Sequence, residues 1–117
     1  MYKIHYLPLA LDDLKEIVRY IAHELEAPRA AENLILKIDK EVQKTADNPY
    51  RCHLFVSPEK LKYEYRILNV NIYFLFYVVE PTAEGAGRGS PPKKGKIEIH
   101  RVIYSKRNII SILKGQE

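Results

Sequence analysis

The stretch from Tyr63 to Val79 constrains the fold of this chain more strongly than any other part of the sequence. In its first half, apolar and aromatic side chains alternate with a second set that carries charge: Tyr63, Tyr65 and Ile67 against Glu64, Arg66 and Leu68. A period of two predicts a β-strand with one apolar face and one charged face. From Ile72 to Val79 both faces are apolar or aromatic, which is typical of a central strand covered on both sides.

The tripeptide Asn69-Val70-Asn71 separates the two predicted strands. Asparagine tolerates left-handed backbone angles, so this tripeptide has the chemistry of a tight turn. The sequence therefore predicts a rigid β-hairpin that displays the guanidinium of Arg66 beside tyrosines. A guanidinium in a fixed position can bind a phosphate in a defined geometry.

The elements predicted around the hairpin are two long helices, two further strands and a short last helix. They are a strand at 2–6, helices at 9–26 and 28–46, a strand at 97–104 and a helix at 106–114. In both long helices apolar residues recur at three- and four-residue steps. Only Ala27-Pro28 separates the two helices, which favours an antiparallel helical hairpin. Ser105 is the expected cap of the last helix.

The element order β-α-α-β-β-β-α predicts the α+β class, with a small, mostly antiparallel sheet packed against the helical hairpin. We expect the opposite face of the sheet to be open and flanked by the last helix. The residues expected to converge on this open face come from the strands and their ends: Arg66, Tyr104, Lys106 and Arg107.

The length of 117 residues predicts a single domain, 1–117. Residues 80–96 hold four of the five glycines and three of the seven prolines, which predicts a flexible loop between the third and fourth strands. No apolar run approaches the roughly 20 residues that span a bilayer. The opening residues lack the apolar region of a secretory signal, so we expect a cytoplasmic protein with no membrane partner.

Charge is distributed unevenly along the chain. Residues 1–80 hold 11 Lys and Arg against 12 Asp and Glu, whereas residues 81–117 hold 8 against 3. A basic C-terminal end favours an acidic or polyanionic partner, although a solvated basic surface explains the same asymmetry. Cys52 is the single cysteine, and Cys52-His53 has no second cluster at metal-ligand spacing, so we expect neither a metal nor a cofactor.

The sharpest constellation in the sequence is a run of charges at every second position. It consists of Lys60, Lys62, Glu64 and Arg66. If the strand begins early enough, all four side chains point to one face. Two interpretations remain open at this stage: a phosphate-binding face, or an edge strand whose charges block pairing with other sheets.

Taken together, these segments resemble the RelE/ParE toxins of type II toxin–antitoxin systems, also called plasmid-stabilisation proteins. The opening is similar to a family pattern of Ala-x-x-Asp-Leu-x-x-Ile-x-x-Tyr-Ile, carried here by Ala10, Asp13, Leu14, Ile17, Tyr20 and Ile21. The hairpin resembles a Tyr-Arg pair, a turn and a Tyr-x-x-x-Tyr strand, carried here by Tyr65-Arg66, Tyr73 and Tyr77. The ending IHRVIYSKRNI resembles the last strand and arginine-rich exit of the family.

This resemblance implies a compact RelE-like toxin that a cognate antitoxin wraps around and neutralises. Two activities occur in the family. RelE-like members are mRNA interferases, endoribonucleases that cut mRNA in the ribosomal A site by turning a 2′-hydroxyl onto the scissile phosphate. ParE-like members inhibit DNA gyrase by binding it, without a hydrolytic site.

Carried over residue by residue, the resemblance implies catalytic roles for four positions and RNA binding for three. Those implied as catalytic are Arg66, Tyr104, Arg107 and Glu64, and those implied to bind RNA are Lys60, Lys62 and Lys106. Tyr104 stands where many relatives have a histidine, and a tyrosine with a pKa of about 10 exchanges protons poorly near neutrality. His100 either takes over that role or is an ordinary histidine of the strand.

Three functions follow from the resemblance. The first is a RelE-like mRNA interferase that acts at the ribosome, which the arginine constellation favours. The second is a ParE-like, non-enzymatic inhibitor of gyrase that uses the basic C-terminal end and the last helix. The third is an inactive family member that only binds its antitoxin.

Overall fold

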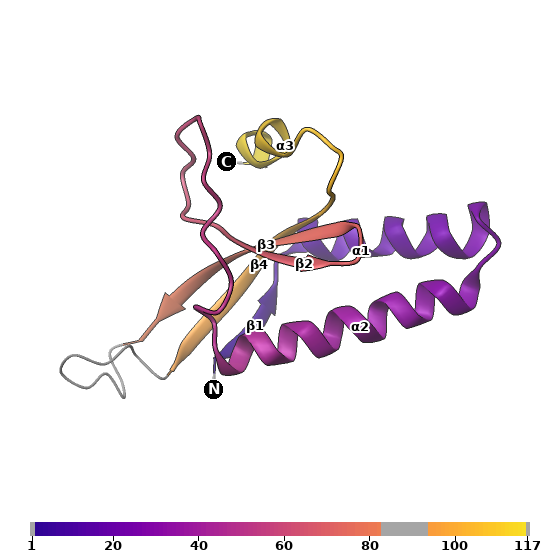
Figure 1. The fold of residues 1–117 in the computed structure, drawn as a ribbon, viewed down its shortest axis with the longest axis horizontal. Helices are drawn as coiled ribbons and strands as arrows, with labels where there is room; N and C mark the ends of the chain where they lie inside the picture. The colour runs from indigo at the N-terminus through magenta and orange to yellow at the C-terminus, as the bar shows by residue number, and fades with distance from the viewer. Residues whose placement is uncertain (1, 83–93, 117) are drawn as a thin grey trace.

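The computed structural model describes residues 2–82 and 94–116. In chain order, the elements are β1 (Lys3–Tyr6), α1 (Pro8–Arg19), the π-helical turn η1 (Tyr20–Glu24), α2 (Pro28–Asp47), β2 (Arg66–Val70), β3 (Tyr73–Pro81), β4 (Gly95–Tyr104) and α3 (Ile109–Gln116). They form a four-stranded sheet in the order β1-β4-β3-β2, in which β1 is parallel to β4 and the other pairs are antiparallel. The predicted α+β class and the mostly antiparallel sheet are confirmed (Figure 1).

One face of the sheet, which we call the helix face, is covered by the hairpin of α1 and α2 (Figure 1). The buried side chains of α2 recur at four-residue steps, at Leu34, Ile38, Val42 and Ala46. They pack against buried residues of the three long strands, among them Leu75 and Ile97. Burying one such aliphatic side chain contributes roughly 1.5–3 kcal/mol, so this stripe fixes the long helix on the sheet.

The short strand β1 leaves half of one edge of β4 unpaired. Their pairing spans only Lys3–Tyr6 against Lys96–Ile99, after which the chain turns into α1. Asp13 of α1 takes over at this point: its carboxylate accepts a hydrogen bond from the backbone N–H of Val102 at 2.9 Å. The same carboxylate accepts hydrogen bonds from Nε and Nη2 of Arg101 at 2.7 and 2.9 Å. The side chain of Asp13 therefore pairs with a backbone N–H group at the open edge of β4 and fixes α1 beside that edge.

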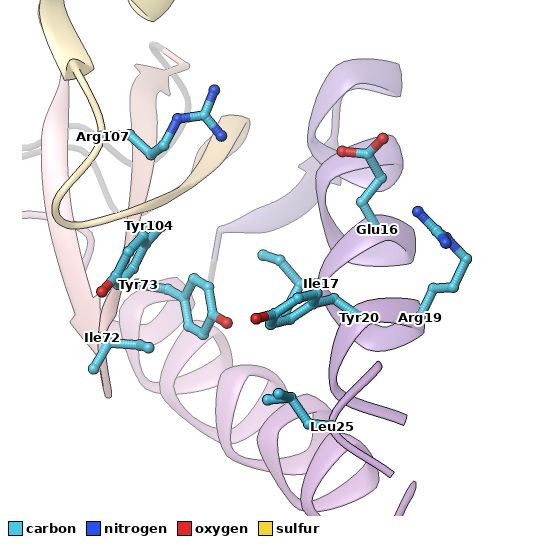
Figure 2. A pocket seen from close by; sticks show the side chains of 9 residues that line it. All are labelled: Glu16, Ile17, Arg19, Tyr20, Leu25, Ile72, Tyr73, Tyr104 and Arg107. Carbon is cyan, nitrogen blue, oxygen red and sulfur yellow. The ribbon is translucent and has the colours of Figure 1, made fainter. Parts of the chain in front are cut away.

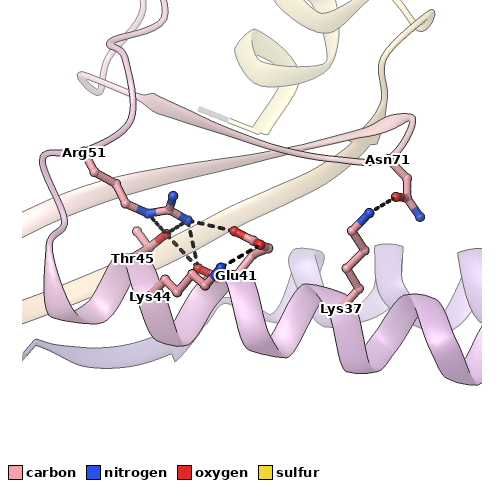
Figure 3. Close-up of polar contacts among 6 residues, drawn as sticks. All are labelled: Lys37, Glu41, Lys44, Thr45, Arg51 and Asn71. Carbon is pink, nitrogen blue, oxygen red and sulfur yellow. Dashed lines mark hydrogen bonds and ion pairs between the residues drawn. The ribbon is translucent and has the colours of Figure 1, made fainter.

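The hairpin of β2 and β3 differs from the predicted one at both ends of its first strand. Strand β2 begins at Arg66 rather than Tyr63, and it runs through Val70, which pairs with Tyr73. The turn is thus Asn71-Ile72, and Asn71 adopts the left-handed conformation with φ 55°. Lys37 Nζ of α2 donates a hydrogen bond to Asn71 Oδ1 at 2.6 Å, which ties the hairpin tip to the helix (Figure 3).

The loop between α2 and β2 is anchored at its start by a second polar cluster (Figure 3). Arg51 donates hydrogen bonds to the side chains of Thr45 and Glu41 and to the carbonyl of Glu41. The hydrogen bond from Arg51 lowers the pKa of Glu41, against the effect of burial. This clasp sets the direction in which the loop leaves the helix and crosses to the other face of the sheet.

The second face of the sheet is not open, contrary to the expectation from sequence. Tyr65, Phe76, Ile103 and Leu113 form a buried cluster there, with partly buried side chains from the loop and from α3 packed around it. Helix α3 begins at Ile109, and its cap is Asn108 rather than Ser105, because Asn108 Oδ1 accepts a hydrogen bond from Ser111 N at 3.3 Å. The apolar side of α3 therefore packs against the second face of the sheet.

A β-bulge in β4 separates residues that simple alternation would place on one face. Tyr77 pairs with Ile99 and Phe76 pairs with Arg101, so His100 is the extra residue. An extra residue reverses the alternation beyond it. His100 consequently lies on the second face, whereas Tyr104, which pairs with Tyr73, lies on the helix face.

The predicted loop at 80–96 is shorter at both ends, because β3 extends to Pro81 and β4 starts at Gly95. Most of the predicted loop, residues 83–93, lies outside the described residues. Among the helices that the structure describes, none combines the length and apolar character needed to cross a membrane.

Replacing Asp13 with Asn tests the lock between α1 and β4. The variant leaves the charge of Arg101 partly buried without its carboxylate, so we expect the free energy of unfolding to fall by about 3 kcal/mol. Urea denaturation followed by circular dichroism measures this change. The matched control is Asp12→Asn at the neighbouring exposed position, which should leave stability within about 0.5 kcal/mol of wild type. Equal stability of both variants would contradict the proposed lock.

Candidate functional site

A groove of about 600 Å³ opens between α1 with η1 on one side and the hairpin tip with the end of β4 on the other (Figure 2). Its lining residues are Glu16, Ile17, Arg19, Tyr20, Leu25, Ile72, Tyr73, Tyr104 and Arg107. They belong to α1, η1, β3 and β4 and to the turns beside these elements. The hydrogen bonds between Asp13 and β4 and between Lys37 and Asn71 hold these elements in place. Six of these nine lining residues are aromatic or charged: Glu16, Arg19, Tyr20, Tyr73, Tyr104 and Arg107.

Three tyrosines from three elements form the centre of the groove. The rings of Tyr73 and Tyr104 have centroids 6.2 Å apart, and Figure 2 shows the hydroxyls of Tyr20 and Tyr73 pointing toward each other. The π-helical turn η1 carries Tyr20, which is 52% exposed. This turn follows directly on α1 and ends the first helical segment. π-Helical turns are rare and are frequent at functional sites.

The phenol of Tyr73 is suited to hydrogen bonding rather than to proton transfer near neutrality. Burial raises the pKa of Tyr73, and the nearby Tyr104 and Tyr20 raise it further. At physiological pH this phenol therefore stays protonated, with an O–H donor and an oxygen acceptor.

Two arginines stand on opposite walls of the groove. Arg107 follows the end of β4, in a turn where its N–H donates to the carbonyl of Tyr104 at 2.9 Å. Arg19 lies across from it on α1, with Glu16 one turn earlier (Figure 2). Within the described part of the chain, neither guanidinium has an ion-pair partner. Both are free to bind a carboxylate or a phosphate.

Arg66 does not lie in this groove. Its Nη1 donates a hydrogen bond to the carbonyl of Cys52 at 2.7 Å, and its guanidinium lies 4.9 Å from the ring centre of Tyr50. It pairs with Tyr77, four residues along β3 from Tyr73, which is about 13 Å at ~3.3 Å per residue. The structure therefore does not bring Arg66 together with Tyr104 and Arg107.

The other predicted site residues are also dispersed. Lys60, Lys62 and Glu64 precede β2, so strand alternation does not align them with Arg66. The ammonium of Lys62 lies 5.4 Å from the ring centre of Tyr63. Lys106 is exposed in the turn after β4 but does not line the groove. Of the seven predicted residues, the groove brings together Tyr104 and Arg107.

His100 is buried on the second face of the sheet and does not line the groove that holds Tyr104 and Arg107. The rings of Tyr63 and Tyr65 lie at 4.8 and 5.3 Å between centroids, and Nε2 is 3.5 Å from Glu98 Oε1. Burial by itself would raise the pKa of Glu98, but its contacts with Lys96 and His100 outweigh burial and lower it. His100 therefore does not substitute for Tyr104. Over residues 2–82 and 94–116, no group of three His, Cys, Asp or Glu side chains is placed to hold a metal ion.

Five residues that line the groove had no predicted functional role: Tyr20, Tyr73, Arg19, Glu16 and Ile72. Tyr20 and Tyr73 both belong to the sequence patterns that carry the family resemblance. They are far apart in sequence, so the sequence does not indicate that their side chains face each other. Both tyrosines occupy recognisable places in the sequence, because Tyr20 follows the last residue of α1 and Tyr73 follows the hairpin turn. A tyrosine at each of these two ends is the sequence signal that could have identified them.

The comparison with protein families gives one match. The family model described as ParE toxin of type II toxin-antitoxin system, parDE, matches residues 4–86, which is more than half of the chain. The matched segment runs from β1 through β3 and includes one wall of the groove and the hairpin tip. No curated protein matches the chain.

The raised pKa of Tyr73 predicts a loss of stability in alkali. A tyrosine in an unfolded chain loses its proton near pH 10, before Tyr73 does in the folded state, so stability falls as pH rises above about 10. Tyr73→Phe removes this contribution, and we expect a smaller drop in unfolding free energy between about pH 8 and about pH 10.5 than in wild type. Urea denaturation at both values measures it. Parallel drops in the two proteins would contradict the assignment.

Proposed function

Because the chain belongs to the ParE toxin family of type II toxin–antitoxin systems, we propose that it arrests DNA gyrase by binding it and not by cutting RNA. The chain is the toxin of such a system, and its partner is an antitoxin. The groove between α1 and the hairpin tip is the surface proposed to contact the target.

The observation that carries this proposal is the position of Arg66. Cleavage at a phosphate needs a cation on the phosphate and groups that move protons, all within hydrogen-bond reach of one reacting centre. Arg66 is engaged with Cys52 and Tyr50 at a separate place from Tyr104 and Arg107. The groove itself is lined by tyrosines and by no histidine. This arrangement favours recognition over transesterification.

The composition of the groove also favours binding to a protein. Tyrosine and arginine are enriched among the residues that carry most of the energy at protein interfaces. Here they surround exposed aliphatic side chains, Leu25 and Ile72, each 55% exposed. Exposed apolar residues gathered at one groove are typical of an interaction site.

A second candidate function, the RelE-like mRNA interferase, is supported by one observation. Tyr104 and Arg107, two of the four residues implied to be catalytic, do line the same groove. In that role Arg107 would hold the phosphate and Tyr104 would move the proton, with Arg66, Glu64 and the RNA-binding lysines Lys60, Lys62 and Lys106 brought in only by binding at the ribosome. An inactive, antitoxin-binding member is the third candidate.

A supercoiling assay with purified gyrase tests the proposed target. We expect wild type to inhibit supercoiling, and Arg107→Glu and Tyr104→Ala to need about tenfold more protein for half inhibition. Lys40→Glu is the charge-matched control, because Lys40 is exposed on α2 and does not line the groove. Unimpaired supercoiling with excess wild-type protein would rule out gyrase as the target.

Arg66→Ala separates the binding and nuclease hypotheses inside cells. Under the binding hypothesis Arg66 only holds the loop at Cys52, so the variant should lose about 1–2 kcal/mol of stability and still arrest growth. Under the nuclease hypothesis it should abolish discrete mRNA breaks, mapped by primer extension after induction. Breaks that appear with wild type and vanish with Arg66→Ala would replace the gyrase proposal. Normal growth with wild type would support the inactive member.

A further inference from the structure

The tip of the β2–β3 hairpin is held from two directions by residues that do not themselves line the groove. From α2, Lys37 Nζ donates a hydrogen bond to Asn71 Oδ1 at 2.6 Å, across 34 positions of sequence (Figure 3). From the turn after β4, the backbone N–H of Ser105 donates a hydrogen bond to the carbonyl of Ile72 at 2.9 Å. Two consecutive residues of one tight turn are therefore bonded to two distant parts of the chain.

The hydrogen bond from Lys37 sets where the turn lies rather than whether it forms. Asn71 has the left-handed φ of 55°, which asparagine adopts readily without help from another residue. Lys37 is exposed, but the next residue, Ile38, is only 2% exposed and belongs to the stripe that fixes α2 on the sheet. The ammonium of Lys37 is therefore carried by a rigid support, and it fixes the position of the tip relative to that support.

The turn that carries Arg107 depends in its own turn on the tip. Tyr104 is the last residue of β4 and pairs with Tyr73, directly after the tip. Ser105 follows and bonds to the carbonyl of Ile72, and the N–H of Arg107 bonds to the carbonyl of Tyr104 at 2.9 Å. A displacement of the tip would thus be passed to the arginine turn, and this wall of the groove would shift relative to the wall formed by α1 and η1 (Figure 2).

We infer that Lys37 is a positioning residue for the groove: through Asn71 it fixes the hairpin tip and so places Tyr104 and Arg107 for contact with the target. The inference rests on the proposed binding role of the groove, but it does not require gyrase to be the target. A surface that is already ordered loses less conformational freedom when it binds, and it binds more tightly for that reason. Lys37 does not line the groove, so its contribution passes through the tip.

Lys37→Met removes the donor and keeps a long, unbranched side chain. We expect about fivefold weaker inhibition of supercoiling than with wild type. We also expect the NMR order parameter of the Ile72 amide to fall below the value of about 0.85 that is typical of rigid backbone. A variant that only lowered global stability would leave this order parameter unchanged, because its folded molecules would be as rigid as before. Lys40→Met is the matched control, since Lys40 is exposed on the same helix and loses the same charge. It should change neither measurement.

Variants of Asn71 and a double-mutant cycle show whether Lys37 acts through the tip. Asn71→Gly keeps the left-handed turn accessible but removes the acceptor, so it should weaken inhibition as Lys37→Met does, and the double variant should be no weaker than either alone. Asn71→Asp keeps an acceptor oxygen and should stay within about twofold of wild type. In the Arg107→Glu background, Lys37→Met should have less than about a twofold effect, because the arginine that it positions is absent.

Two results would overturn the inference: an unchanged order parameter at Ile72 in Lys37→Met, or additive effects of Lys37→Met and Asn71→Gly on inhibition. The two proposals fail separately. If wild type does not inhibit gyrase, the proposed target is removed, and the order parameters still decide whether Lys37 positions the tip. If Lys37→Met inhibits gyrase as strongly as wild type does, the proposed target is retained and the inference is overturned.

Discussion

The carboxylate of Asp13 is the contact on which the rest of this architecture depends. Strand β1 is too short to pair with the whole of β4, and the backbone N–H of Val102 would otherwise stay unsatisfied at a covered edge. Asp13 accepts that hydrogen bond together with two from Arg101, and these bonds raise the pKa of the guanidinium. Helix α1 is thereby fixed against the end of β4, and the groove exists because these two elements cannot slide apart.

The two faces of the sheet have separate roles as a result of the bulge at His100. On the helix face, the ring of Tyr104 packs beside that of Tyr73 at a tilt of 55°, at the end of the sheet beside α1 and η1. On the second face, His100 is enclosed by aromatic rings under the loop and α3. His100 and Tyr104 therefore lie on opposite faces although they are four residues apart in sequence. The side chains that meet in the groove are tyrosine rings and the guanidiniums of Arg19 and Arg107. Tyrosine rings and guanidiniums are residue types that contribute strongly to protein interfaces.

The elements themselves were predictable from the sequence because their signals are local. The amphipathic period of the long helices, the start of the second helix at Pro28 and the doubly apolar β3 each depend on neighbouring residues, and all three are observed. The first helix was predicted to reach residue 26, but α1 ends at Arg19 and the π-helical turn η1 follows it. Boundaries were less well predicted. The first strand of the hairpin was predicted to begin at Tyr63, but it begins at Arg66, and the residues before it form a loop in which Tyr65 is buried in the cluster on the second face.

The sequence by itself determined the α+β class, the order of the elements and the likeness to type II toxins, since each follows from periodicity and from motifs read along the chain. Only the tertiary structure decided which side chains form the groove. Tyr20 and Tyr73 are more than fifty positions apart, and the bulge and the Asp13 lock that set the groove are pairings between distant segments. Alternation predicts which face a residue takes only while the register is unbroken, and one extra residue in β4 was enough to reverse it.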